Sequence, residues 1–117
     1  MKILTRKQFM EMPEGTVYSY YEPYCFRGLQ IKDSSPEKGY PDFSCSDLIG
    51  AIECDSSDDF VTKCERMETG ESVSVDFEYS GREGLFDEKL LYAIYEKPDI
   101  EKLIKRLQDS QCQNTTN

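Results

Sequence analysis

One apolar run decides the fold that we predict from the sequence: Leu90-Leu91-Tyr92-Ala93-Ile94-Tyr95. The run does not alternate between apolar and polar residues, and this pattern is typical of a strand that is covered on both faces. We therefore predict a central strand over residues 90–96. Pro98 follows almost at once, and proline is favoured in the first turn of a helix, so we expect a helix directly after the strand.

The residues on either side of this strand predict its neighbours. Over residues 73–79, apolar and polar side chains alternate at seven consecutive positions, which predicts a strand with one face in the core. A charged loop over residues 80–89 would join the two strands. Beyond Pro98, the apolar residues have helical spacing and predict one stripe packed on the sheet: Ile100, Leu103, Ile104 and Leu107.

The N-terminal residues predict a short helix. Thr5 and Gln8 have the spacing of a capping box, in which each side chain bonds the backbone amide of the other residue. We expect the helix to run from about residue 6 to residue 11. Pro13 and Gly15 then turn the chain away from the helix.

A hairpin is predicted next. β-Branched and aromatic residues favour a strand over residues 16–21, and clean alternation favours a return strand over residues 25–32. In the return strand, we expect Leu29 and Ile31 on one face and Gln30 and Lys32 on the other. Gly28 inside this strand indicates a bulge.

The middle of the chain predicts a loop followed by a second helix. Residues 33–42 have loop composition, and extended structure resumes at residues 42–45. Capping residues precede an amphipathic pattern over residues 58–69, and Gly70 is at the position expected of a C-cap. We therefore predict an α+β fold with one domain over residues 1–110 and a disordered tail over residues 111–117. The sheet should be mostly antiparallel, with four to five strands, two main helices on one face and the short N-terminal helix.

The charge is concentrated in the middle of the sequence. The whole chain carries a formal charge of −9, but residues 33–88 hold four bases and sixteen acids, a net −12. Such a field repels nucleic acid and anionic membranes, and it attracts basic protein surfaces. The alternative explanation for the charge is solubility.

Neither a metal site nor a cofactor is predicted. The sequence has no histidine, and its five cysteines are never spaced as C-x-x-C, so we expect reduced and mostly buried thiols. The N-terminus has neither the pattern of a signal peptide nor that of a membrane span, so a cytoplasmic protein, in the host cell, is expected. The sequence also lacks a histidine base, a nucleophile elbow and a phosphate-binding glycine loop, which makes a non-enzymatic protein the prediction.

Three groups of residues are candidates for function. The first is a set of acids that would imitate a phosphate backbone or form a solvated helix face, namely Asp55, Asp58, Asp59, Glu65, Glu68 and Glu71. The second is the loop with Arg82, Glu83, Asp87 and Glu88, in which a planar guanidinium can bind a carboxylate or phosphate. Alternatively, Arg82 pairs locally with Glu83 or Asp87, and Leu85 and Phe86 enter the core.

The third group would bind a small ligand. It combines aromatic rings with two guanidinium groups, from Tyr18, Tyr20, Tyr40, Arg27 and Arg82. Because Tyr18 and Tyr20 share one strand face, at least some of these rings are alternatively expected in the core.

Several short motifs carry a resemblance to a known group. They are Met12-Pro13-Glu14-Gly15-Thr16-Val17-Tyr18, Glu22-Pro23, Phe26-Arg27-Gly28-Leu29-Gln30-Ile31-Lys32, Gly81-Arg82-Glu83-Gly84-Leu85-Phe86-Asp87 and Tyr92-Ala93-Ile94-Tyr95-Glu96. Over residues 2–107 the chain resembles a group of small, uncharacterised accessory proteins of tailed bacteriophages. The resemblance carries over no catalytic residue, and it implies an accessory protein that acts on host machinery, including anti-defence proteins such as CRISPR inhibitors.

These observations lead to one main hypothesis and two alternatives. The main hypothesis is a phage protein that uses its acidic surface to bind and block a host protein or complex with a basic surface, such as a CRISPR defence complex. One alternative is a protein that sequesters a nucleotide or signal molecule. The other is a structural or assembly subunit of the phage, and a homodimer is compatible with each hypothesis.

Overall fold

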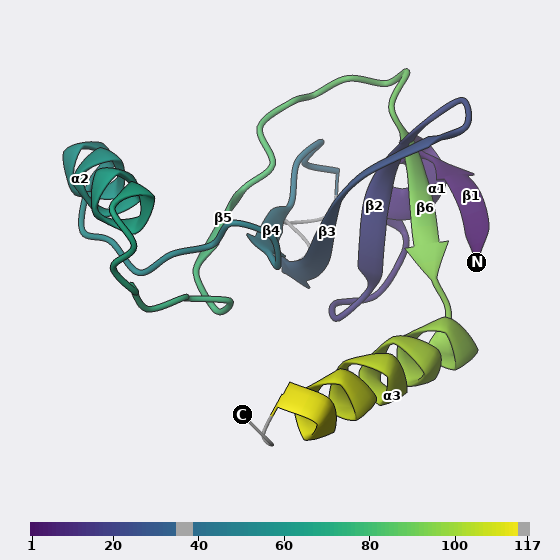
Figure 1. The fold of residues 1–117 in the computed structure, drawn as a ribbon. Helices are drawn as coiled ribbons and strands as arrows, with labels where there is room; N and C mark the ends of the chain where they lie inside the picture. The colour runs from purple at the N-terminus through teal and green to yellow at the C-terminus, as the bar shows by residue number, and fades with distance from the viewer. Residues whose placement is uncertain (35–38, 115–117) are drawn as a thin grey trace.

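The computed structural model describes residues 1–34 and 39–114, and in this part of the chain it has an α+β fold. Its elements in chain order are β1 (Lys2–Thr5), α1 (Arg6–Met10), β2 (Val17–Glu22), β3 (Cys25–Ser34), β4 (Ser44–Asp47), α2 (Ser57–Glu68), β5 (Ser80–Arg82), β6 (Leu91–Tyr95) and α3 (Lys97–Asn114) (Figure 1). The predicted fold class is therefore confirmed.

A single antiparallel sheet organises the fold. Its strands are hydrogen-bonded in the order β1-β6-β2-β3-β4-β5, so the described residues form six strands rather than the four to five we predicted. The apolar run lies in β6, which is flanked by β1 and β2 as expected of an interior strand. The two additional strands are the edges, β1 and β5. Each has only three or four residues, too few for an alternation pattern to be recognised.

The core lies on the sheet face that α1 covers. Cross-strand pairs place Tyr18 beside Ile94 and Tyr20 beside Tyr92 on this face. Phe9 of α1 stacks on the Tyr92 ring, with the centroids 4.3 Å apart, and contacts Tyr18 edge-on at 4.7 Å. Phe9, Tyr18 and Tyr92 are fully buried. Tyr18 and Tyr92 are therefore core residues, and the half-buried Tyr20 packs against them.

The short helix α1 confirms the predicted capping box. The Gln8 amide donates to Thr5 Oγ1 at 3.3 Å, and the Thr5 amide donates to the Gln8 side-chain oxygen at 3.0 Å. The C-terminal end of the helix is bound by Lys32, whose Nζ donates to the carbonyls of Phe9, Met10 and Met12. A helix leaves its last carbonyls unpaired, so an ammonium group at this point is favourable.

Lys32 shares a strand face with Gln30, as predicted, but that face is the core face, where Gln30 pairs with Tyr18. Lys32 is fully buried there, and burial lowers the pKa of its ammonium group. Tyr18 pairs with Gln30 and Tyr20 with Arg27, so β3 has an extra residue near Gly28. The predicted bulge is thus present, and Lys32 lies on the core face, where carbonyls at the end of α1 and just beyond it compensate the burial of its charge.

The strand predicted over residues 73–79 is also wrong. In this segment the described pairing is one isolated bridge, between Ile52 and Val75. Its apolar side chains are exposed, with Phe77 at 46% and Tyr79 at 72% of their accessible surface. Alternation identifies extended backbone, but it does not reveal whether a sheet partner is available.

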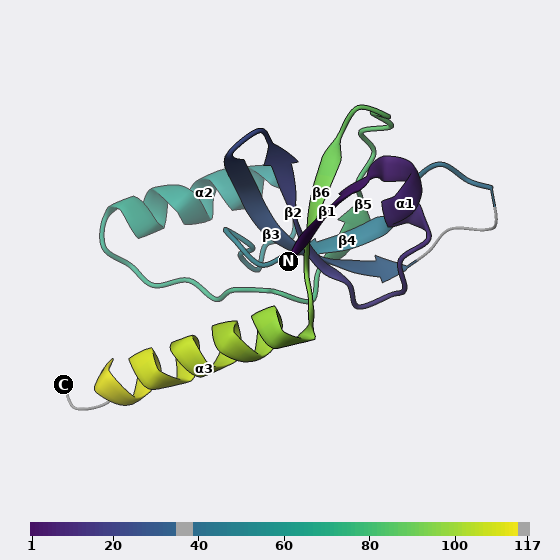
Figure 2. The same ribbon diagram turned by 90° about the vertical axis from the view of Figure 1, so that its right-hand side faces the viewer.

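Helices α2 and α3 have the predicted positions in the chain but not the predicted packing. We expected both on one face of the sheet. Figure 1 instead shows α2 on an arm beyond β5, and Figure 2 shows α3 running away from the sheet. α2 has no buried residue, and in α3 Ile104 and Leu107 are 49% and 61% exposed. An amphipathic pattern predicts an apolar stripe, but it does not determine what covers that stripe.

α3 also extends further than predicted. It includes residues 111–114, which we expected to belong to a disordered tail, and residues 115–117 lie outside the described part. Of the predicted loop over residues 33–42, residues 33 and 34 belong to β3, and residues 35–38 are likewise outside the described part. No described helix combines the length and the apolarity needed to cross a membrane.

The core can be tested with two phenylalanine substitutions. We expect Phe9→Ala to lower the free energy of unfolding by about 3–5 kcal/mol, because it leaves a cavity in the aromatic cluster. Phe77→Ala is the matched control and should change it by less than about 0.5 kcal/mol, because this ring is half exposed. Urea unfolding measures both values. Equal losses would mean that residues 73–79 belong to the core after all.

Candidate functional site

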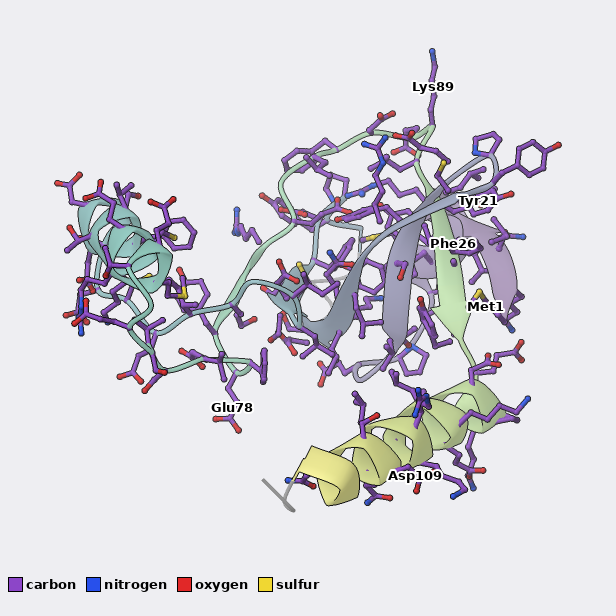
Figure 3. The ribbon with its side chains drawn as sticks, in the orientation of Figure 1. Met1, Tyr21, Phe26, Glu78, Lys89 and Asp109 are labelled. Atoms are coloured by element: carbon purple, nitrogen blue, oxygen red, sulfur yellow. The ribbon has the colours of Figure 1, made fainter. Side chains whose placement is uncertain are left out.

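The most distinctive surface is an arm that carries α2. We define the arm as residues 51–79. Its two limbs run antiparallel and are joined by backbone hydrogen bonds from Glu53 to Ser74 and from Asp76 to Ala51, each 2.9 Å long. Ser56 caps α2 by accepting a hydrogen bond from the amide of Asp59 at 3.1 Å. Figure 3 shows the side chains of α2 radiating outward around the helix.

The six predicted acidic residues divide into two groups on this arm. Asp59 pairs with Lys63 at 3.3 Å, and Glu71 pairs with Arg66 at 3.2 Å. A hydrogen bond from the Asp55 amide is the main reason that the pKa of Asp59 is lowered, and the ammonium of Lys63 adds to this effect. These two carboxylates are therefore used within the arm.

The remaining acids are available to a partner. Among the described residues, none of the ion pairs involves Asp55, Asp58, Glu65 or Glu68. At 100° per residue, Asp58, Glu65 and Glu68 lie within about 80° of arc on α2. They form one acidic stripe, which we call the acidic face of α2.

Apolar side chains are exposed next to the acidic face. Phe60, Val61 and Met67 of α2 are 42%, 53% and 38% exposed. Phe60 and Val61 also line a groove of about 670 Å³ between α2 and the β4–β5 end of the sheet. Its volume is within the range of ordinary ligand-binding clefts. Three carboxylates and one guanidinium line the groove, from Asp47, Asp55, Asp76 and Arg82, so its charge is net negative.

The structure separates the residues of the predicted ligand site. Tyr18 is fully buried, and Tyr20 is half buried and donates to Glu83. Arg27 is exposed and pairs with Glu22 at 3.1 Å. Along β3, Arg27 is seven residues from Ser34, on the order of 20 Å from the end of the strand that pairs with β4. The predicted aromatic cluster is therefore not one pocket.

Tyr40 and Arg82 do lie together. The Arg82 guanidinium donates to the Tyr40 hydroxyl at 3.1 Å and lies 5.4 Å from the centroid of its ring. Both residues are exposed and line a small hollow of about 180 Å³. Arg82 thus binds an aromatic side chain rather than Glu83 or Asp87, the two local partners suggested by the sequence.

The other residues of the predicted loop site have structural roles or no described partner. Asp87 stabilises a turn by accepting a hydrogen bond from the Lys89 amide at 2.9 Å, and Glu88 is exposed. Leu85 and Phe86 do not enter the core, because both remain about half exposed. Glu83 alone is buried, so residues 81–88 do not form a single site.

Glu83 belongs to a buried polar network that sequence reasoning missed. Its carboxylate pairs with Arg6 and accepts hydrogen bonds from Tyr92 at 2.8 Å and Tyr20 at 3.0 Å. Arg6 also donates to the carbonyl of Pro41 at 2.7 Å. The Arg6 and Glu83 side chains are only 2% and 1% exposed. No local pattern indicates this pair, because its members are 77 residues apart.

Neither a metal site in the described part of the chain nor a similarity to a known protein assigns a function. In the described residues, no group of three or more histidine, cysteine or acidic side chains is placed to hold a metal ion. Searches of protein-family models, of curated proteins and of solved structures find no match to this chain. The geometry of the arm and groove must therefore support any functional proposal.

The buried ion pair makes a testable contribution to stability. We expect Arg6→Met to lower the free energy of unfolding by about 3–5 kcal/mol, because it leaves the Glu83 carboxylate buried without a cation. Arg66→Met removes the exposed pair with Glu71 and should cost less than about 1 kcal/mol. In a double-mutant cycle measured by urea unfolding, Arg6→Met and Glu83→Gln should be non-additive. Strict additivity would show that the two side chains do not interact.

The tyrosines of this network predict a loss of stability in alkali. Burial raises the pKa of Tyr20 and Tyr92 above the ordinary value of 10.0, and the Glu83 carboxylate raises it further. Above about pH 10 the unfolded chain loses protons that the native protein retains, so stability should fall as the pH rises. Tyr92→Phe should weaken this dependence between about pH 8 and about pH 11, measured by urea unfolding. A decline parallel to that of the unmodified protein would contradict this explanation.

Proposed function

We propose that this protein is a non-enzymatic binding protein that docks the arm onto a basic surface of a partner protein and blocks it. The observation that carries the proposal is that α2 is folded without a buried residue and presents unpaired carboxylates beside exposed apolar side chains.

A short helix that is not packed on a core gains little stability, so its presence on the surface supports a binding role. A single helix of twelve residues is marginally stable in water, and most helices in proteins are stabilised by packing on a core. α2 is instead stabilised by its N-cap and by pairs such as Asp59–Lys63. Exposed apolar side chains that are grouped in this way mark surfaces for association. Binding would remove them from water.

The charges favour a basic partner. The acidic face of α2 attracts lysine and arginine over distances up to about 10 Å at moderate salt, and it opposes acidic surfaces. The face offers three unpaired carboxylates along one helix, with Asp55 near its start. This number suits a protein patch better than the imitation of a long nucleic-acid duplex.

The resemblance to phage accessory proteins supports a host factor as the partner. A defence complex with a basic nucleic-acid groove, such as a CRISPR complex, has the chemistry that the acidic face complements. Blocking such a groove requires only occupancy, so the protein would act in the host cytoplasm without catalysis.

Charge reversal tests this proposal. We expect the triple variant Asp58→Lys, Glu65→Lys and Glu68→Lys to lose at least about tenfold in affinity for a host protein captured from lysate, because like charges would then meet. A control with the same change of charge elsewhere, Glu14→Lys, Glu88→Lys and Glu101→Lys, should retain it. Binding that survives reversal on the arm, or that is lost equally in the control, would rule out the acidic face as the docking surface.

A further inference from the structure

The outer edge of β5 has backbone groups that the sheet does not use. β5 pairs with β4 in a register that places Gly81 opposite Cys45 and Arg82 opposite Ser44. The Glu83 amide donates to the Phe43 carbonyl at 2.9 Å, so Glu83 and, two residues earlier, Gly81 are the hydrogen-bonded positions. The amides and carbonyls of Ser80 and Arg82 therefore point away from β4.

This edge is not shielded in the usual ways. β5 is the last strand of the sheet, and it contains no proline. Its charged side chain, Arg82, is turned aside to Tyr40. Proteins normally protect an exposed edge with lysine, proline, a bulge or a covering element. Among the described residues, no further strand pairs with this edge, and Gly81 and Arg82 of β5 line the groove.

The groove lies between the free edge and α2. Figure 1 shows β5 at the end of the sheet nearest to the arm, and the lining residues include Gly81 and Arg82 on one side and Phe60 and Val61 of α2 on the other. Extended peptides can add as a strand to an exposed sheet edge, with neighbouring pockets receiving alternate side chains. The backbone groups of the edge would supply affinity, and the groove would select side chains.

We propose that an extended segment of the partner protein adds as a seventh strand to the outer edge of β5, between β5 and α2. The segment carries lysine or arginine alternating with apolar residues. Its apolar side chains contact Phe60 and Ile52, and its cations approach Asp47, Asp55 and Asp76, so its charge complements that of the groove. This inference rests on the proposed function, and it specifies what the arm and groove recognise.

Ser80→Pro isolates the edge interaction. Proline removes the outward amide of residue 80 but none of the hydrogen bonds to β4, which are made at Gly81 and Glu83. Ser80→Ala keeps that amide and is the matched control. Far-ultraviolet circular dichroism and the urea midpoint should show that both variants are folded.

The probe is a seven-residue synthetic peptide that alternates lysine and valine, with its ends blocked. We expect calorimetry to show that Ser80→Pro binds it at least tenfold more weakly than the unmodified protein, whereas Ser80→Ala binds within twofold. The same peptide with glutamate in place of lysine should not bind. A version methylated on alternate backbone amides should also lose binding to the unmodified protein, which tests strand addition even if Ser80→Pro does not fold.

The outcomes distinguish this inference from the proposed function. If Ser80→Pro captures the host protein as well as the unmodified protein does, while reversal of the acidic face abolishes capture, strand addition is overturned and the proposed function stands. If no host protein is captured but the lysine peptide binds in an amide-dependent way, the proposed function fails and strand addition is supported. If light scattering shows a dimer that Ser80→Pro dissociates, the edge is occupied by a second copy, and the inference is overturned.

Discussion

The buried pair of Arg6 and Glu83 is the interaction on which the rest of the structure depends. It joins the first residue of α1 to the residue that follows β5, across 77 positions of sequence. Each charged group would be costly to bury alone. Two tyrosine hydroxyls complete the shell of Glu83, and the carbonyl of Pro41 receives a second hydrogen bond from Arg6. These contacts connect α1, three strand segments and the chain leading into β4.

This connection explains how a three-residue strand can be held at the edge of the sheet. β5 has few backbone bonds of its own, but Glu83, directly after it, is held in the core and donates its amide to Phe43. The limb of the arm that enters β5 is therefore attached to a rigid point. The network stabilises β5 from one side only, and its outer edge remains available. Lys32 has a comparable role, because this buried charged side chain binds carbonyls at the end of α1 from inside the core.

The ordered structure of the arm affects the free energy of association with a partner. The arm is ordered by its own caps, ion pairs and limb-to-limb hydrogen bonds, so a partner would not have to order it on binding. Preorganisation of this kind lowers the entropic cost of association. Burial of exposed apolar side chains would then contribute about 25 cal/mol for each Å² removed from water. The carboxylates of the acidic face add selectivity and faster encounter rather than most of the affinity.

Local chemistry determined much of the secondary structure. The capping box at Thr5 and Gln8, the bulge at Gly28 and the amphipathic pattern of α2 all depend on residues within a few positions of one another, and each is present as predicted. The apolar run of β6 forms an interior strand, as its lack of alternation predicted. The acidic character of the arm could likewise be predicted, because charge is a property of composition.

Only the tertiary structure decided what these elements touch. Lys32 has the alternation of an exposed residue, yet the end of α1 and Met12, just beyond it, provide three carbonyls for its ammonium group. Residues 73–79 alternate like a strand, but among the described residues they form one isolated bridge rather than a strand pair, and α2 and α3 have exposed apolar side chains. The Arg6–Glu83 pair and the free edge of β5 arise from contacts between distant segments. The sequence alone determined which segments are helical or extended, because those preferences are local. Which surfaces are buried and which remain open depends on long-range packing, and no local pattern encodes it.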